Sequence, residues 1–259
     1  MNSSYAQKKA DLRSVLTVYG RKSVLEALTD EMLSCQTLHM ADSNRKGGII
    51  ADIEQRAAAR GVPVRLHTRD ALSRISRNGK QDQGVALDIA CPAFAALDQG
   101  WLQARLVGSK APLTLLAMDG VTNPQNVGMI IRSAAAAGVD GIIYPDKGLA
   151  ALGPLVIKAS VGTVFRAPLL RCERLLPALR LCQAQGIEVS YLDGNADNSI
   201  FEQAGAGHRV YVLGGETHGV SAEIRELADT ALSIPMAGGV ESLNVAVSAA
   251  LVAYASQRR

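Results

Sequence analysis

Apolar and polar positions follow two different periods along this 259-residue chain, and the changes of period predict its elements. From residue 113 onward, short apolar runs alternate with stretches in which apolar positions recur every third or fourth residue. The first pattern is typical of strands buried on both faces, and the second of amphipathic helices. We predict strands at residues 113–118, 141–144, 164–168, 187–191, 209–214 and 231–235, and helices at 127–137, 151–160, 173–185, 221–228 and 243–257.

This alternation indicates an α/β domain with a largely parallel sheet covered on both faces. Residues 18–90 have shorter patterns of the same kinds, at 22–28, 37–40, 48–60, 62–66, 71–77 and 85–89, which predict a small N-terminal α/β domain. Pro92, Gly100, Gly108 and Pro112 interrupt the segment between the two, where we expect a linker with some helix around residues 97–107. The predicted division is a flexible tail at 1–17, a first domain at 18–92, a linker at 93–111 and a second domain at 112–259.

The composition narrows the class of protein. The chain has no run of eighteen apolar residues, and its first residues lack an apolar segment after their charges, so a secreted or membrane-spanning product is disfavoured. Cys35, Cys91, Cys172 and Cys182 are widely spaced, with no C-x-x-C pair and no histidine at zinc-ligand spacing. We therefore expect a cytoplasmic protein with reduced thiols and no metal site.

The net charge of +3 is unevenly distributed. Residues 1–95 hold 14 basic and 10 acidic residues, a net charge of +4, whereas the remainder holds 13 and 14, a net charge of −1. The basic excess is concentrated in a run that only Asp70 interrupts, formed by Arg60, Arg65, Arg69, Arg74, Arg77 and Lys80. Such runs are more often solvated faces than binding sites, but this one can also contact phosphates. Aromatic residues are only 4% of the chain, which argues against a base-stacking platform of the kind that reads single-stranded nucleic acid.

Three segments share one design, in which an apolar strand leads through a loop rich in glycine, proline or amide residues into a helix. The loops are Asp119-Gly-Val-Thr-Asn-Pro-Gln-Asn126, Gly214-Gly-Glu-Thr-His-Gly219 and Pro235-Met-Ala-Gly-Gly-Val-Glu-Ser-Leu-Asn244. Ligands of open α/β sheets bind beyond the carboxyl ends of the strands, so we expect the three loops to converge on one site. No G-x-G-x-x-G follows a strand, which argues against a nicotinamide enzyme and a Rossmann-type methyltransferase.

These loops resemble the three motifs of the SpoU/TrmH family of SPOUT RNA methyltransferases, in the family's order and spacing. The matching residues are Asn123-Pro-Gln-Asn-Val-Gly with Arg132, Leu213-Gly-Gly-Glu, and Ile234-Pro-Met with Ser242-Leu-Asn-Val. Tyr19-Gly-Arg-Lys and Gln83-Gly-Val-Ala resemble the RNA-docking domain, related to a ribosomal-protein fold, of the RlmB-like members. The resemblance implies a SPOUT domain whose parallel sheet contains a deep trefoil knot, in place of the unknotted default, and a homodimer with its sites at the subunit interface.

The resemblance also assigns site residues. It implies S-adenosyl-L-methionine as methyl donor, and catalytic roles for Arg132, Asn126, Glu216, Ser242 and Asn244. Cofactor contacts are implied for Leu213, Gly214, Gly215, Ile234, Met236, Ser242 and Leu243. For RNA contacts, the candidates are Arg21, Arg65, Arg69, Arg74, Arg77 and Lys80.

Other interpretations of single residues stay open. Asn126 can serve only as a helix N-cap, and Glu216 can be an ordinary exposed carboxylate near a helix start. Arg132 falls off the apolar stripe of its helix, on the side of Gly128, whose missing side chain would leave space for an anionic group. The chain departs from the family at Arg21 and Asp82, where related proteins often have histidine, and at Thr163, where many have alanine.

We expect the protein to methylate a ribose 2′-hydroxyl of RNA. The preferred target is a guanosine in large-subunit ribosomal RNA. A transfer RNA substrate is an alternative. A non-catalytic RNA-binding or ribosome-assembly protein of the same fold is an alternative of another class, and the five intact candidate residues weigh against it. The basic N-terminal domain disfavours a small-molecule methyltransferase.

Overall fold

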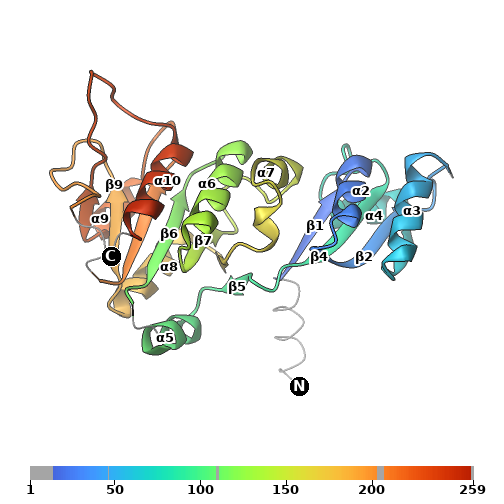
Figure 1. The fold of residues 1–259 in the computed structure, drawn as a ribbon, viewed down its shortest axis with the longest axis horizontal. Coiled ribbons are helices and arrows are strands. Elements are labelled where there is room, and N and C mark those ends of the chain that lie inside the picture. The colour runs from blue at the N-terminus through green and yellow to red at the C-terminus, as the bar shows by residue number, and fades with distance from the viewer. Residues whose placement is uncertain (1–13, 46, 109–110, 203–206, 258–259) are drawn as a thin grey trace. The chain divides into compact units, whose positions relative to one another are not determined.

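The computed structural model describes residues 14–45, 47–108, 111–202 and 207–257 (Figure 1). The described residues form two compact units, one made of those up to residue 92 together with 152–154 and the other made of those in 93–151 and from 155 onward. Most of the predicted tail lies outside the described residues. Its last part, residues 15–17, was assigned wrongly, because these residues begin a strand.

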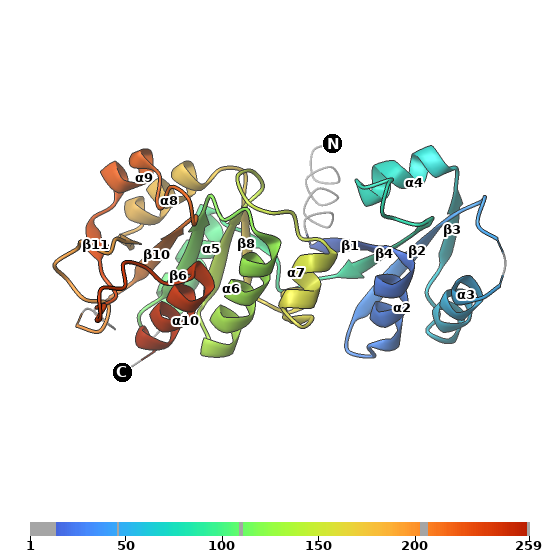
Figure 2. The ribbon, with the colours of Figure 1, turned by 90° about the horizontal axis from the view of Figure 1, so that it is seen from above.

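The first unit contains a mixed four-stranded sheet of order β1-β4-β2-β3. Strand β4 is antiparallel to β1 and β2, and β3 is parallel to β2. Figure 2 shows α4 on one face of this sheet and α2 and α3 on the other. The elements are β1 (Val15–Tyr19), α2 (Arg21–Thr29), β2 (Ser34–Ala41), α3 (Ile49–Ala59), β3 (Val64–His67), α4 (Arg69–Ser76) and β4 (Val85–Ala90).

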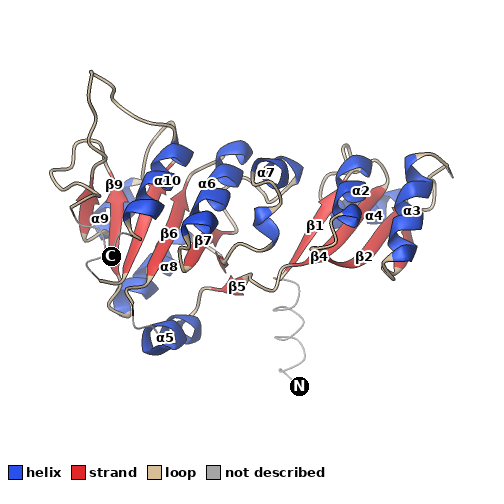
Figure 3. Ribbon diagram, viewed as in Figure 1, coloured by secondary structure: helices blue, strands red, loops and turns tan. Residues whose placement is uncertain are grey.

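The second unit contains a seven-stranded sheet of order β11-β9-β10-β6-β7-β8-β5, in which every neighbouring pair is parallel. The α/β class with a parallel sheet is therefore confirmed, and the knot stays a prediction. Figure 3 distinguishes the strands of this sheet from the helices around it. The elements are β5 (Ala95–Ala96), α5 (Gln99–Gly108), β6 (Thr114–Asp119), α6 (Pro124–Ala137), β7 (Gly141–Pro145), α7 (Pro154–Ala159), a 3₁₀ turn η1 (Thr163–Phe165), β8 (Leu169–Cys172), α8 (Leu175–Ala184), β9 (Glu188–Leu192), β10 (Arg209–Gly214), α9 (Ala222–Leu227), β11 (Thr230–Leu232) and α10 (Val245–Ala255).

Helices cover both faces of the parallel sheet. On one face, Leu102 of α5, Leu179 of α8 and Ile224 of α9 pack with inward-facing residues of the strands. On the other, Val252 of α10 packs with Tyr211 of β10, and α10 also packs against α6 (Figure 2). Because all strands run the same way, the loops after β6, β10 and β11 leave the sheet at its carboxyl edge.

Two predictions in this unit need correction. Residues 164–168 are not a strand, since Val164 and Phe165 are buried in the 3₁₀ turn and the strand lies further on, in β8. Pairing in fact begins at the residue before β8, where the Pro168 carbonyl accepts a hydrogen bond from the Ile142 amide at 2.8 Å. The expected linker also contributes to the sheet, because β5 pairs with β8.

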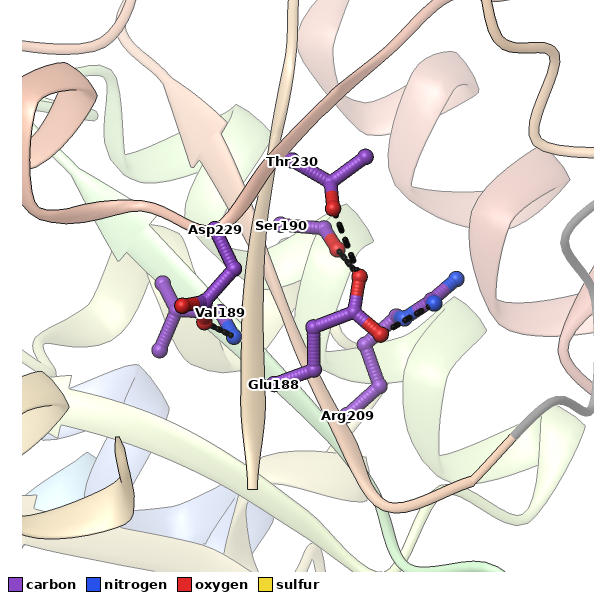
Figure 4. A network of polar contacts seen from close by, with 6 residues as sticks. All are labelled: Glu188, Val189, Ser190, Arg209, Asp229 and Thr230. Atoms are coloured by element: carbon purple, nitrogen blue, oxygen red, sulfur yellow. Dashed lines mark hydrogen bonds and ion pairs between the residues drawn. The ribbon is translucent and has the colours of Figure 1, made fainter. Parts of the chain in front are cut away.

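An ion pair joins β9 and β10 where both strands begin (Figure 4). Arg209 is buried and donates to the Glu188 carboxylate, which also accepts hydrogen bonds from the Thr230 and Ser190 hydroxyls at 2.8 and 3.3 Å. Burial alone would raise the pKa of Glu188, but the hydrogen bonds, above all from Arg209, outweigh it and hold this pKa below its usual value. This network lies at the opposite edge of the sheet from the three motif loops.

Candidate active site

The loop after β6 leads into α6 through a conventional helix start. Asn123 is the N-cap, with its side-chain oxygen accepting from the Gln125 amide at 2.9 Å, and Pro124 follows in the first turn. The interpretation of Asn126 as the N-cap is therefore wrong. Asn126 lies inside the first turn and is only 3% exposed, so its amide group is available for a contact with another segment.

That contact joins the first and third loops. Asn244 donates from its side-chain nitrogen to the Asn126 side-chain oxygen at 3.2 Å, across 118 positions of sequence. Asn244 is also the N-cap of α10, because its oxygen accepts from the Ala246 amide at 2.8 Å. The two asparagines thus hold the N-termini of α6 and α10 together, at the edge of the sheet where the motif loops emerge.

Arg132 lies two turns into α6 and is exposed. The expected space for an anion beside it, at Gly128, is absent. A β-carbon at Gly128 would lie 2.6 Å from the Val156 carbonyl oxygen and 2.6 Å from the β-carbon of Ala159, so this glycine allows α7 to pack closely on α6. Any anion that Arg132 binds must therefore approach from the exposed side of α6.

The loop after β10 is compact and packs on the loop after β6. Gly214 pairs with Asp119 in the β10–β6 ladder, and a β-carbon at Gly215 would lie 2.4 Å from the Gly120 carbonyl oxygen. The loop closes on itself where the Gly219 amide donates to the Gly215 carbonyl at 2.9 Å. Glu216 lies at its exposed tip, so the loop presents a carboxylate to solvent on a fixed backbone.

The loop between β11 and α10 extends away from the sheet (Figure 1). Three of its apolar side chains are exposed, with Met236 at 36%, Val240 at 52% and Leu243 at 37%. Gly238 and Gly239 lie between these side chains in the sequence, and both have positive φ. They make a turn whose backbone conformation is strained for residues with a β-carbon. Exposed apolar side chains around a glycine turn form a surface that an apolar ligand can cover.

The predicted site residues are thus partly brought together. Asn126 contacts Asn244, and Gly214 and Gly215 contact the loop after β6. Leu213 and Ile234 are buried, and Ile234 packs in the core against α10. Within the described ranges, Arg132, Glu216 and Ser242 make no hydrogen bond or ion pair with one another, and all three are exposed.

The two cysteines of the second unit are not suited to act as nucleophiles. Burial raises the pKa of the Cys172 thiol to about 12, with a further contribution from Asp146, and burial likewise raises that of Cys182 to about 12. A thiol is a nucleophile only as a thiolate, so neither residue is reactive at neutral pH.

In the first unit, the two segments that resemble the RNA-docking motif lie side by side. The Arg21 amide donates to the Gln83 side-chain oxygen, and the Arg21 Nε donates to the Gln83 carbonyl, both at 3.1 Å. Asp82, which departs from the family pattern, is buried and accepts from the Ser76 hydroxyl and the Gly84 amide, each at 2.9 Å. It therefore shapes the loop and is not available to RNA.

The residues of the predicted basic run have two different environments. Arg60 is not a surface cation, because its guanidinium donates to carbonyls at the end of α2 and beyond, those of Ala27, Leu28, Asp30 and Leu33. The other members are exposed on β3, on α4 and in the loop that follows, namely Arg65, Arg69, Arg74, Arg77 and Lys80. In the portion that the structure describes, no helix has the length and apolar character needed to cross a membrane.

Comparison with solved structures shows the same fold. The SpoU methyltransferase AviRb from Streptomyces viridochromogenes, in complex with AdoMet, has a TM-score of 0.63 at 21% identity, covering 99% of this chain and 92% of that one. An AdoMet-bound rRNA methyltransferase from Sinorhizobium meliloti has a TM-score of 0.60 at 23% identity, covering 97% and 90%.

Comparison of sequences identifies the family. A 23S rRNA (guanosine-2′-O-)-methyltransferase RlmB of Xylella fastidiosa is 35% identical over 225 residues, which cover 87% of this chain and 88% of the relative. An uncharacterized tRNA/rRNA methyltransferase of Mycolicibacterium vanbaalenii is 35% identical over 254 residues, covering 97% and 79%. The family model for RNA 2′-O ribose methyltransferase substrate binding matches residues 17–95, and that of the SpoU rRNA Methylase family matches residues 114–254. The chain therefore belongs to the SpoU rRNA methylase family and is an RNA methyltransferase.

Proposed function

We propose that this protein transfers the methyl group of S-adenosyl-L-methionine to the 2′-hydroxyl of a guanosine in large-subunit ribosomal RNA, in the cytoplasm. The observation that carries the proposal is the Asn126–Asn244 hydrogen bond, which joins two of the three motif loops at the carboxyl edge of a parallel sheet. The choice of ribosomal RNA and of guanosine rests on the Xylella relative, which is similar along 87% of the chain. Transfer RNA is the alternative target.

The loop between β11 and α10 fits such a cofactor. Adenosine has an apolar face, and Met236, Val240 and Leu243 expose apolar surface beside the glycine turn. A β-carbon at Gly238 or Gly239 would meet nothing within 4 Å, so the turn has room for a ligand close to its backbone. Leu213, Gly214, Gly215, Ile234 and Ser242 complete the proposed contacts. The deep trefoil knot of the family, which would bring these segments together, belongs to the same proposal.

S-adenosyl-L-methionine supplies an electrophilic methyl group when bound. The nucleophile is the ribose 2′-oxygen, which must lose its proton as the new bond forms. Arg132 is a poor base because a guanidinium side chain stays protonated in proteins. We assign Arg132 to binding the neighbouring phosphate and to stabilising the negative charge that develops on the 2′-oxygen, while the proton leaves to phosphate or water.

The remaining polar residues orient the reacting groups. Glu216, exposed at the tip of its loop, orients Arg132 or the RNA. Asn126 is fixed by Asn244, and Ser242 lies two residues before that asparagine, so the three residues position the hydroxyl or the methionine part of the cofactor. Amide and aliphatic hydroxyl groups form hydrogen bonds but do not readily gain or lose a proton at neutral pH, so Asn126, Asn244 and Ser242 suit a role in orientation more than in proton transfer.

We propose a homodimer that forms through the exposed faces of α6 and α10. Met129 on α6 is 39% exposed, and Val247 and Tyr254, seven residues apart on α10, are 48% and 55% exposed. Helices α6 and α10 pack against each other, so these exposed apolar residues lie on neighbouring helices. Arg132 is three residues after Met129 on the exposed side of α6, so a second copy of the chain on this face would lie next to the site.

A glutamate at Val247 is therefore expected to convert the dimer to a monomer, because the charge would be buried without a partner at the interface. Sedimentation velocity measures the oligomeric state, and initial rates measure the accompanying loss of methyl transfer. Val107→Glu is the matched control, since Val107 is 89% exposed on α5, on the opposite face of the sheet. A dimeric Val247→Glu protein would refute this interface.

We assign RNA docking to the exposed cations of the first unit, and this predicts how salt affects binding. Replacing Arg65, Arg69 and Arg74 together with alanine is expected to weaken RNA binding and to flatten the plot of log K against log salt concentration. The slope should change by roughly 0.7 to 0.9 for each RNA phosphate that the variant no longer neutralises. Filter binding at several salt concentrations measures both the RNA affinity and the slope. Arg56→Ala is the control, because Arg56 is exposed on α3, on the other face of that sheet from α4 (Figure 2), and an equal effect there would indicate non-specific attraction.

The function itself is tested by incubating the protein with labelled S-adenosyl-L-methionine and, separately, unmodified ribosomal RNA and transfer RNA. Nucleoside mass spectrometry identifies the product. We expect 2′-O-methylguanosine from ribosomal RNA only, and none with Arg132→Ala. Product from transfer RNA only would identify the alternative substrate, and no product from either RNA would favour the non-catalytic alternative.

A further inference from the structure

A carboxylate that takes no part in the proposed chemistry links β6 to the segment after β10. Asp119 is the last residue of β6, and its Oδ2 accepts from the backbone amide of Ser221 at 2.7 Å, across 102 positions of sequence. Ser221 is the N-cap of α9, but its own side chain makes no capping hydrogen bond. The start of α9 is therefore fixed from a neighbouring strand, by a charge-assisted bond that is stronger than one between neutral groups.

The loop that carries Glu216 is held at both ends by the same part of β6. At its beginning, Gly214 pairs with Asp119 and Gly215 packs on the Gly120 carbonyl. At its end, the Asp119 side chain holds the amide of Ser221. The loop spans only six residues between these two attachments, so any movement of its end displaces the tip.

A second side chain holds the residue before Ser221. Arg225 on α9 donates from Nε to the Val220 carbonyl at 3.0 Å and pairs through Nη1 with Asp193 Oδ2 at 3.3 Å. The end of the loop is thus held from β6 and from the segment after β9. Glu216 is exposed and makes no such contact of its own with any residue that the structure describes, so its position depends on these backbone anchors.

We propose that Asp119 is a positioning residue for methyl transfer, which acts by fixing the loop that presents Glu216. This inference rests on the role proposed above for Glu216. We assign Asp119 no contact with either reactant, since its Oδ2 is engaged by the Ser221 amide. Its removal should affect turnover far more than binding.

The first experiment compares Asp119→Ala, Asp119→Asn and Asp140→Ala. We expect Asp119→Ala to lower kcat by about 10- to 100-fold, as displacement of a catalytic group by about 1 Å can do, with KM values within about twofold. Asp119→Asn keeps an acceptor oxygen and should recover most of the rate. Asp140 is the matched control, because its Oδ2 accepts from the Thr114 amide at 2.8 Å at the other end of β6. Asp140→Ala should lower the unfolding midpoint but not kcat.

The second experiment is a double-mutant cycle with Glu216→Gln. If Asp119 acts through Glu216, Asp119→Ala adds no further loss to a Glu216→Gln protein. Independent, multiplicative losses would overturn the inference, as would a kcat for Asp119→Ala equal to that of Asp140→Ala. A Glu216→Gln protein with normal turnover would refute the role of Glu216 and this inference together, while the methylated product would leave the proposed reaction standing.

Amide hydrogen exchange tests the positioning without any enzymatic activity. Asp119→Ala is expected to accelerate exchange across residues 215–221, and Asp140→Ala is not. Unchanged exchange in Asp119→Ala would overturn the inference even in a protein that lacks methyl transfer. The absence of product from the unaltered protein would refute the proposed function and the catalytic half of this inference, while faster exchange in Asp119→Ala would still show that Asp119 fixes the loop.

Discussion

Replacing Arg132 with alanine is expected to lower kcat by about 100- to 1,000-fold, the range found when a group that stabilises developing charge is removed. Affinity for RNA should stay within about twofold, because docking is assigned to the exposed cations of the first unit and Arg132 lies on α6 of the second. Initial rates with labelled S-adenosyl-L-methionine and filter binding of the same RNA measure the two quantities.

Two further variants define what the arginine does. Arg132→Lys keeps the charge but loses the planar fork that binds two oxygens at once, so a steep loss of rate is expected there too. A lysine variant with most of its activity would contradict the forked geometry. Arg180→Ala removes an exposed arginine from α8, on the opposite face of the sheet, and should leave the rate unchanged. A loss of RNA affinity in Arg132→Ala equal to its loss of rate would make Arg132 a docking residue instead.

The sequence predicted most elements because each has its own period. Residues 209–214, for example, form an apolar run that is the β10 strand with the same bounds. The strand at Val15–Tyr19 was partly missed because it follows a polar segment and is stabilised by β4, which lies far along the chain. The strand prediction at residues 164–168 was wrong for a related reason. A short apolar segment fits a buried turn as well as a strand, and only the position of β7 selects which residues pair.

The candidate site shows the same division. The residue types and the order of the three loops predicted that these loops lie at one edge of the sheet. No pattern predicts a bond between Asn126 and Asn244, because spacing along the chain carries no information on contacts across 118 positions. Gly128 was misread for that reason, since the space beside a glycine depends on which element packs there. Asp119 was visible as a carboxylate at the end of an apolar run, and only the structure shows its partner.

The Glu188–Arg209 pair, which lies far from the motif loops, was also not predicted. It is structural because it stabilises the beginnings of β9 and β10, and the Thr230 hydroxyl extends it toward β11 (Figure 4). A buried arginine at this position keeps three adjacent strands in register. The loops at the other edge of the sheet depend on that register, so the pair supports the site without contacting it.

Arg209→Met is expected to destabilise the protein by about 2 kcal/mol at pH 7, less than for a fully buried pair because the Glu188 side chain remains 30% exposed. The loss arises because methionine fills the space but leaves the Glu188 carboxylate without its main partner. The folded protein holds the pKa of Glu188 below its usual 4.5, so the pair stabilises the fold above that pH and the difference between the two proteins should shrink as pH falls further. Urea denaturation at pH 7 and below pH 4 measures this difference. Arg171→Met breaks a more exposed pair with Asp146 and should cost less than about 1 kcal/mol, so an equal loss there would contradict the special role of Arg209.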